Sequence, residues 1–286
     1  MAGRVSSASS GIITLLTDFG TCNAFVGIMK GVILGAYPRA RLVDLTHDLD
    51  SQDVLGGALL LRSAVPYFPC GTVHLAVVDP GVGSSRRGLV IATRTALLVG
   101  PDNGILSLAA RALGGGRAQA LDIDQLVARR IVRAPVSQTF HGRDVFAPIA
   151  AHLAKGRPLR SLGPAVDRIV ELALPACRIT RTQIVGEVIY IDRFGNLITN
   201  IGAEDLNELA SYSPASLSVS IGRVRSDDID GLVPAYASVP QGTPLAILGS
   251  WGQLEIAVRD GNARQRLSAR CGTPVRVTVN GNALKR

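Results

Sequence analysis

Short apolar runs typical of strands alternate with runs typical of helices over about the first eighty residues, and this alternation restricts the fold more than any other feature. We predict strands at 11–17, 41–46 and 72–79 and helices at 24–36 and 53–64. Pro38 ends the first helix, because proline and the residue before it both resist helical backbone. Asp53 is placed to cap the second helix. This β-α-β-α-β order predicts parallel strands with helices on both faces of the sheet, and polar groups beyond the carboxyl ends of the strands.

The pattern changes near Pro175. Before it, we predict a hairpin at 88–99, a turn and helix within 101–113, and a loop and helix within 141–156. Beyond it, β-rich runs are separated by turn residues, as in a small barrel or sandwich. These runs lie at 184–192, 215–222, 243–249, 253–258 and 274–279. We therefore predict an α/β N-terminal domain with a mainly parallel central sheet at 11–172 and a small β-rich C-terminal domain at 183–286.

The formal net charge of +8 raises the question of nucleic-acid binding, but the distribution of basic residues argues against it. Only three of the thirty Lys and Arg residues are lysines, the arginines are scattered, and aromatic residues make up 4% of the chain. A site for a nucleic acid needs clustered basic residues, interleaved with aromatic rings where bases stack. We expect no nucleic-acid partner.

Several classes of protein are disfavoured by motifs that the sequence lacks. It has no dinucleotide fingerprint, phosphate loop, nucleophile elbow or H-E-x-x-H zinc pair. The four cysteines form no C-x-x-C pair, so we expect free thiols, no metal and no cofactor. The apolar run at 12–16 is too short for a signal sequence, and no run approaches the roughly 20 apolar residues of a membrane span. We predict a cytoplasmic protein with a frayed N-terminal tail and no contact with a membrane.

Polar segments follow the three predicted strands and hold candidate site residues. Asp18 follows the first strand, where its carboxylate either accepts both hydroxyls of a ribose or caps the next helix. His47 follows the second strand, and the sequence leaves its role open. Asp79 ends the third strand, glycines follow it, and Arg86 lies seven residues further on. This last segment is either a loop that approaches a ligand closely or a structural ion pair that closes a turn.

His141 is the histidine best placed for catalysis. It lies in a polar loop that opens a helix, so its imidazole can point into a cleft. His74 falls inside a strand and is expected in the core, whereas His152 is expected on a helix surface.

The C-terminal half holds a second group of candidates. Asp192, Phe194 and Asn196 lie in a turn that either contacts an amino acid or a purine, or is an ordinary hairpin turn. Trp251, the only tryptophan, either stacks on a base or fills the core. Glu255 alternates with apolar residues, and the sequence does not decide between exposure and a ligand contact.

Eight segments, in this order, carry a resemblance to a known family. They read LLTDFG, FVGIMKGVI, VDLTHDLD, GTVHLAVVDPGVGSSRRG, VGPDNGILS, TFHGRD, IDRFGNLITNI and GSWGQLEIAV. Together they strongly resemble the S-adenosylmethionine hydroxide adenosyltransferases, the hydrolytic relatives of the fluorinase and chlorinase. The resemblance runs from about Ile12 to Ala263 and is more specific than any one motif.

The resemblance implies a reaction in which water attacks the ribose C5′ of S-adenosyl-L-methionine and releases adenosine and L-methionine. It also implies that the C-terminal domain is a β-barrel and that the chain forms a homotrimer with active sites at subunit interfaces. Asp79, Arg86 and His141 correspond to the Asp-Arg-His set with which the family activates water. Which of Asp79 and His141 takes the proton is left open.

Further ligand contacts are implied one residue at a time. Asp18 matches the carboxylate that grips the ribose diol, and Asp192 and Asn196 match residues that hold the methionine and adenine portions. The remaining implied contacts are Ser250, Glu255 and Ala263 in the barrel, and the rings of Phe140, Phe194 and Trp251 packed against the adenosine.

Two alternatives compete with hydrolysis. Halide-dependent adenosyl transfer is disfavoured because a carboxylate such as Asp79 repels an anion, and because Gly142 stands where the fluorinase carries a halide-binding serine. A non-catalytic sensor of S-adenosylmethionine or adenosine would keep Asp18 and Asn196 but would not need all three catalytic groups.

Overall fold

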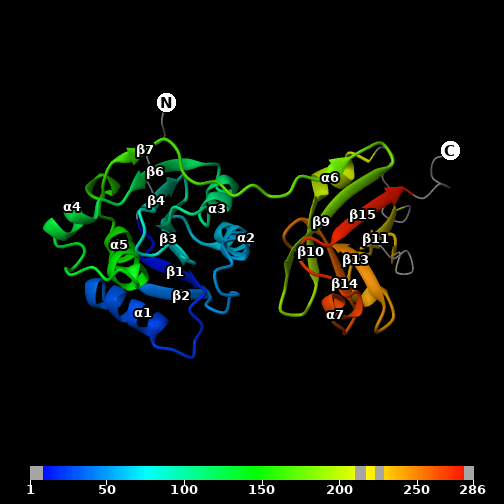
Figure 1. Cartoon of the computed structure of the whole chain (residues 1–286), viewed down its shortest axis with the longest axis horizontal. Coiled ribbons are helices and arrows are strands. Elements are labelled where there is room, and N and C mark those ends of the chain that lie inside the picture. Colours follow the sequence, from blue (N-terminus) through cyan, green and yellow to red (C-terminus); the bar gives the residue numbers. More distant parts are fainter. Residues whose placement is uncertain (1–8, 210–216, 223–228, 280–286) are drawn as a thin grey trace. The chain divides into compact units, whose positions relative to one another are not determined.

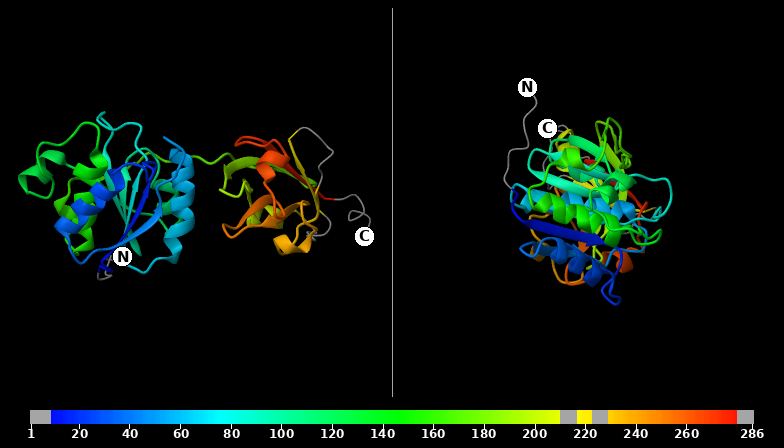
Figure 2. Two further views of the ribbon diagram at one scale, coloured as in Figure 1. Left: turned by 90° about the horizontal axis from the view of Figure 1, so that it is seen from below. Right: turned by 90° about the vertical axis from the view of Figure 1, so that its left-hand side faces the viewer.

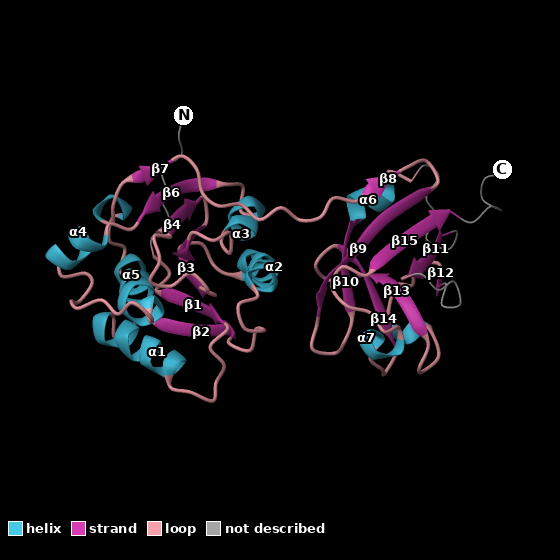
Figure 3. Ribbon diagram, in the orientation of Figure 1, coloured by secondary structure: helices cyan, strands magenta, loops and turns pink. Residues whose placement is uncertain are grey.

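The computed structural model describes residues 9–209, 217–222 and 229–279 and divides into two compact units, Met1–Leu172 and Ala173–Arg286 (Figure 1). Most of the predicted N-terminal tail, and the first two residues of the predicted run at 215–222, lie outside the described residues. Helices are concentrated in the first unit and strands dominate the second (Figure 3). Among the described residues, none of the helices has the length and apolar character that a membrane span requires.

The first unit is built on a seven-stranded sheet with the order β2-β1-β3-β5-β4-β6-β7. The strands are β1 (Ile12–Thr17), β2 (Arg41–Thr46), β3 (Thr72–Val77), β4 (Gly88–Thr93), β5 (Ala96–Pro101), β6 (Gly116–Ala120) and β7 (Ala165–Val166). Strands β2, β1, β3 and β5 run parallel, whereas β4, β6 and β7 pair in antiparallel fashion. The predicted α/β domain with a mainly parallel sheet is confirmed, as is the hairpin of β4 and β5.

Helices cover both faces of this sheet (Figure 2). They are α1 (Phe25–Ala36), α2 (Val54–Ala64), α3 (Ser107–Ala112), α4 (Ile123–Ala128) and α5 (Ala147–Ala154). Helices α1 and α5 pack on one face, and α2 and α3 on the other. Met29 and Ile33 of α1 are fully buried, which stabilises the unit by about 2 kcal/mol for each side chain. Asp53 caps α2 as predicted, since its carboxylate accepts the Gly56 N–H at 2.8 Å.

The second unit is a β-barrel, which confirms the fold implied by the resemblance. Its strands are β8 (Arg178–Ile179), β9 (Gln183–Ile191), β10 (Leu197–Gly202), β11 (Leu217–Ile221), β12 (Ile229–Asp230), β13 (Pro244–Leu248), β14 (Gln253–Val258) and β15 (Pro274–Val279). The order is β12-β11-β15-β9-β10-β14-β13, and contact between β12 and β13 nearly closes the barrel. Buried and half-buried side chains alternate along β11, as expected for a strand with one face in the core. The short helices α6 (Ala203–Asn207) and α7 (Ala263–Arg266) lie outside the sheet path.

Candidate active site

The parallel strands β1 and β3 bring two predicted site residues to the same edge of the first sheet. Thr17 pairs with Val77 at the ends of these strands. Asp18 follows Thr17 directly, and Asp79 comes two residues after Val77. Both carboxylates therefore leave the sheet at its carboxyl edge, where α/β proteins bind ligands.

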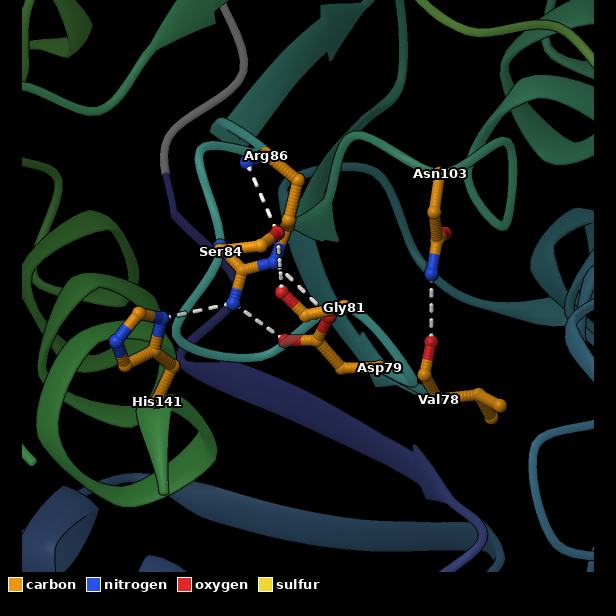
Figure 4. Close-up of polar contacts among 7 residues, drawn as sticks. All are labelled: Val78, Asp79, Gly81, Ser84, Arg86, Asn103 and His141. Atoms are coloured by element: carbon orange, nitrogen blue, oxygen red, sulfur yellow. Dashed lines mark hydrogen bonds and ion pairs between the residues drawn. The ribbon is translucent and has the colours of Figure 1, made fainter. Parts of the chain in front are cut away.

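Asp79, Arg86 and His141 form one connected cluster (Figure 4). Arg86 Nε donates to Asp79 Oδ1 at 2.9 Å, and Arg86 Nη2 donates to Asp79 Oδ2. The same Nη2 lies 2.7 Å from His141 Nδ1. The side chains of Asp79 and Arg86 are only 5% and 13% exposed, so their charges interact with little screening by water. The sequence offered a ligand loop or a structural ion pair, and the ion pair exists with a histidine attached to it.

The loop from Asp79 to Arg86 is shaped by glycine and serine. Ser84 Oγ donates to the Gly81 carbonyl at 2.7 Å and accepts the Arg86 N–H at 3.2 Å. Gly83 has a φ of +76°, and a Cβ on it would lie 2.3 Å from the carbonyl oxygen of Gln138. Only glycine therefore lets this loop lie against the segment that leads to His141.

Hydrogen bonding fixes the protonation of His141. A guanidinium only donates, so His141 Nδ1 accepts from Arg86 and the proton of the neutral ring lies on Nε2. Burial and the charge of Arg86 lower the pKa of His141 from its ordinary value of 6.5, against the opposing effect of Asp79 and Asp144. The imidazole is therefore neutral at pH 7.

A second Asp-Arg pair beside the cluster is a useful contrast. Arg87 Nε and Nη2 donate to Asp102, whose carboxylate also accepts the Val170 N–H at 2.8 Å. This pair ties segments of the chain together and has no histidine attached to it. The neighbouring arginines thus make two different pairs. Arg87 and Asp102 form a structural pair, whereas Arg86 and Asp79 form a pair of the type expected at a reactive site.

Asp18 and Phe140 lie in the same unit as the cluster. Asp18 Oδ2 accepts the Gln52 N–H at 2.8 Å, while Oδ1 has no partner within the described part of the chain. Phe140 is half-buried and makes edge contacts with Phe19 and Phe25, at centroid distances of 5.8 and 5.2 Å. Asp18 therefore keeps an oxygen available for a ligand hydroxyl.

The barrel holds a cavity of about 640 Å³, large enough for a ligand of the size of a nucleoside. Six of the seven predicted ligand contacts in this unit line it: Asp192, Phe194, Asn196, Ser250, Trp251 and Glu255. The seventh, Ala263, begins α7 and is fully buried in the barrel core. Its role stays a prediction.

Asp192 and Asn196 are held against each other at the turn between β9 and β10. Asp192 Oδ1 accepts the N–H groups of Phe194 and Asn196 at 2.9 Å, and Oδ2 accepts Asn196 Nδ2 at 2.9 Å. Asp192 is therefore the cap of a hairpin turn and also a wall of the cavity. The hairpin turn is therefore confirmed, and the contact with an amino acid or a purine stays a prediction.

Trp251 is half-buried and lies outside the barrel core, with its ring 5.4 Å from that of Tyr190. It borders the cavity and does not fill the core. Phe194 is 74% exposed and presents a second ring to the same cavity. Such rings are suited to packing against a flat base.

Glu255 is buried on β14, where it borders the cavity and accepts the Tyr236 hydroxyl at 2.6 Å. Burial raises the pKa of Glu255 from its ordinary value of 4.5, and the nearby Asp192 adds to this effect. Tyr236 was not among the predicted residues. It begins the short 3₁₀ helix Tyr236–Ser238, in a stretch of sequence without a periodic pattern, and nothing in the sequence signals its approach to Glu255.

The fold and site together define a class: a two-domain protein with an Asp-Arg-His cluster at the carboxyl edge of a parallel sheet and a nucleoside-sized cavity in a β-barrel. The chain belongs to the SAM hydroxide adenosyltransferase family. The family's N-terminal domain matches residues 13–163 and its C-terminal domain matches residues 186–276.

Individual relatives are similar over nearly the whole chain. An (R)-S-adenosyl-L-methionine hydrolase of Salinispora tropica is 42% identical, over 93% of this chain and 97% of the relative. The protein of the same name from Thermus thermophilus is 40% identical, over 93% and 98%. A fluorinase of an Actinoplanes species is 28% identical, over 93% and 97%. The crystal structure of an uncharacterized conserved protein from Thermotoga maritima matches with a TM-score of 0.84 and 34% identity, over 93% of this chain and 99% of that one.

Proposed function

We propose that this protein hydrolyses S-adenosyl-L-methionine to adenosine and L-methionine. The observation that carries the proposal is the connected cluster of Asp79, Arg86 and His141 in a chain about 40% identical to hydrolases of that name. No resident cofactor is needed, because the substrate already carries its own leaving group.

The chemistry requires an activated water and little else. The water oxygen forms a bond to the ribose C5′, and the bond from C5′ to the sulfonium sulfur breaks with its electron pair on sulfur. Methionine leaves as a neutral thioether, so no acid is needed at the leaving group. The water loses one proton to a base. This proton carries the positive charge that the sulfonium loses, so the overall charge is conserved. Bulk water has a pKa of about 15.7, so the site must favour hydroxide character as the new bond forms.

We propose that Asp79 takes this proton, and the contacts of His141 support this choice. His141 Nδ1 is occupied by Arg86 and its Nε2 already carries hydrogen, so the neutral ring has no site for the proton while that contact holds. A carboxylate has about four lone-pair positions, and Arg86 uses two of them at Asp79. Arg86 Nη1 has no partner in the described part of the chain and can donate to the water as negative charge develops on it. His141 Nε2 is a second donor.

Substrate binding is proposed to draw on both domains. Asp18 would accept the ribose hydroxyls, while the cavity of the barrel would hold the adenine and methionine portions through Asp192, Asn196 and the ring of Trp251. We also propose that the chain acts as a homotrimer with active sites at subunit interfaces. Sedimentation velocity tests this assembly, and a monomer at assay concentration contradicts it.

Halide-dependent transfer and a sensor role are the competing functions. A side chain at position 142 would begin with a Cβ only 3.2 Å from Met29 Sδ and from the ring of Phe19, so this chain has little room for the serine used by the fluorinase. Added chloride or fluoride is expected to give no halogenated adenosine.

Incubation of S-adenosyl-L-methionine in oxygen-18 water tests the proposal. The native protein is expected to give unlabelled methionine and adenosine with one heavy oxygen at C5′. Asp79→Asn should abolish the product. Asp102→Asn is the matched control, because Asp102 is an equally buried carboxylate paired with the adjacent arginine, and this variant should still form the product. Binding of the substrate without any product from the native protein would favour the sensor.

A further inference from the structure

His47 is a buried histidine that the proposed chemistry does not use, and it joins two strands. It is 4% exposed, and its Nδ1 lies 2.8 Å from Thr17 Oγ1 at the end of β1. Its Nε2 lies 3.1 Å from Asp44 Oδ1 on β2, an electrostatic contact that lacks the alignment of a good hydrogen bond. Asp44 is in turn bound to Lys30 Nζ at 2.6 Å. The result is a chain of contacts Thr17–His47–Asp44–Lys30.

The same histidine ties the loop after β1 to the loop after β2. The His47 carbonyl accepts the Gly20 N–H at 2.8 Å. Thr17 Oγ1, already bound to the His47 ring, lies 3.3 Å from the Phe19 nitrogen and accepts its N–H. Asp18 lies between these two anchored residues, and its own Oδ2 accepts the Gln52 N–H. Thr17, Asp18 and Gly20 are therefore bound directly to the segment 47–52. Phe19 is bound to it through Thr17 Oγ1.

The charge of Asp44 determines which atoms carry hydrogen in the chain of contacts from Thr17 to Lys30. Burial opposes the charge of Asp44, but the hydrogen bond from Lys30 and the electrostatic attraction of Lys30 and His47 outweigh it and lower the pKa of Asp44 from 3.8. Asp44 is therefore an acceptor, and the His47 nitrogen that faces it carries the hydrogen. In the neutral ring Nδ1 is then an acceptor, so Thr17 donates its hydroxyl hydrogen to His47 and keeps its lone pairs for the Phe19 N–H.

We propose that His47 is a positioning residue, which holds the loop 17–20 so that Asp18 presents its free oxygen to the ribose hydroxyls. This inference rests on the proposed function for the identity of the ligand. It predicts that damage to the contact between His47 and Thr17 weakens substrate binding and leaves the chemical step at Asp79 unchanged.

The first sheet contains a matched pair that lacks this connection. Thr14 Oγ1 on β1 lies 2.8 Å from His74 Nδ1 on β3, and both side chains are fully buried. No residue of the loop 17–20 is bound to this pair by any hydrogen bond of the described chain. A purely structural role for a buried Thr-His pair should therefore give the same result at both places.

Two replacements of His47 separate its two contacts. His47→Asn keeps a polar atom near the position of Nδ1 and loses the reach to Asp44. His47→Gln places its amide near the position of Nε2 and loses the contact with Thr17. We expect the Km for S-adenosyl-L-methionine to rise about tenfold in His47→Gln and in Thr17→Val, and to stay within about threefold in His47→Asn. The kcat should change by less than about twofold in all three.

Thr14→Val is the control, expected to lower the melting temperature about as much as Thr17→Val without changing Km. Equal Km changes in the Thr14 and Thr17 variants, or equal losses in the Asn and Gln variants, would overturn the inference. Amide hydrogen exchange of a peptide that covers residues 17–24 gives a second readout that needs no turnover. Faster exchange in His47→Gln than in His47→Asn supports positioning, and equal exchange contradicts it. If the native protein forms no adenosine, the proposed function fails by itself, and the exchange data still decide whether His47 holds the loop.

Discussion

The two units of the chain present their polar groups in opposite ways. In the α/β unit, Asp79, Arg86 and His141 are held in place by hydrogen bonds to one another. In the barrel unit, the cavity of about 640 Å³ is open, and its rings and carboxylates face space that a ligand can occupy. The first arrangement is organised before any substrate arrives, as electrostatic catalysis requires. The second has the concave form of a recognition site.

The difference extends to charge. The cluster places one guanidinium beside one carboxylate, so its charges balance locally. The cavity is bordered by Asp192, Glu255 and Asp260 with Arg259 as its only cation in the described lining. An excess of carboxylates suits a ligand that carries a sulfonium and an ammonium group. We therefore expect changes in the cluster to act on kcat and changes in the cavity to act on Km.

Arg86→Lys is expected to have the largest effect. Lysine keeps the charge but loses the planar fork that reaches Asp79 and His141 together, so kcat should fall about 100-fold or more with little change in Km. Arg87→Lys is the matched control, because Arg87 is adjacent in sequence and Asp102 is the charged residue with which it pairs. Steady-state kinetics of both variants test this. Similar kcat losses in the two variants would show that the cluster is a structural ion pair.

Trp251→Ala tests the other half of the comparison. Removal of a ring that borders the cavity should raise Km about tenfold, since stacking of a base on an aromatic side chain contributes roughly 1–3 kcal/mol. The kcat should stay within about threefold of native. Calorimetric titration with adenosine checks the binding loss directly, and a fall in kcat at unchanged affinity would contradict the division between the units.

The sequence predicts the cluster better than the cavity, for a physical reason. Asp79 and Asp18 lie at the ends of apolar strands, and parallel strands must end at one edge, so their approach follows from the order of the elements. The contact of Arg86 with His141 could not be derived in this way, because it depends on a close approach at Gly83 between loops that are far apart in sequence.

In the barrel, the apolar pattern predicts strands, and only the resemblance to a known family indicates which side chains border the cavity. Tyr236 lies in a single 3₁₀ turn and reaches Glu255 only through tertiary packing. Asp192 shows a different limit, since one carboxylate both caps a turn and borders the cavity. When one residue both caps a turn and borders a cavity, its sequence pattern cannot decide between the two positions.

The pH dependence of kcat should report the cluster. The pKa of His141 is lowered below 6.5, so the ring stays neutral as pH falls to that value, and protonation at lower pH breaks its contact with Arg86. We expect kcat to be constant between about pH 8 and pH 6.5 and to fall several-fold at more acidic pH. His141→Asn should have a lower kcat throughout and should lose this acidic limb. An acidic limb that persists in the variant would place the titrating group elsewhere.

Tyr236→Phe should give the smallest effect, and its dependence on pH is diagnostic. Burial raises the pKa of Glu255, and the hydrogen bond from the Tyr236 hydroxyl opposes that rise. Loss of the hydroxyl therefore raises the pKa of Glu255 further. As the pH falls, Glu255 of the variant is protonated and loses its negative charge at a higher pH than in the native protein.

If the charge of Glu255 attracts the cationic substrate, Km in Tyr236→Phe should rise about threefold at mildly acidic pH and by less at alkaline pH, where Glu255 is ionised in both proteins. The double variant with Glu255→Gln supplies the control. In that background the group that titrates is gone, so Tyr236→Phe should change Km by the same factor at every pH. A difference that persists without Glu255 would mean that the Tyr236 hydroxyl acts on the ligand directly, and the cavity would then recognise its substrate through hydrogen bonds more than through charge.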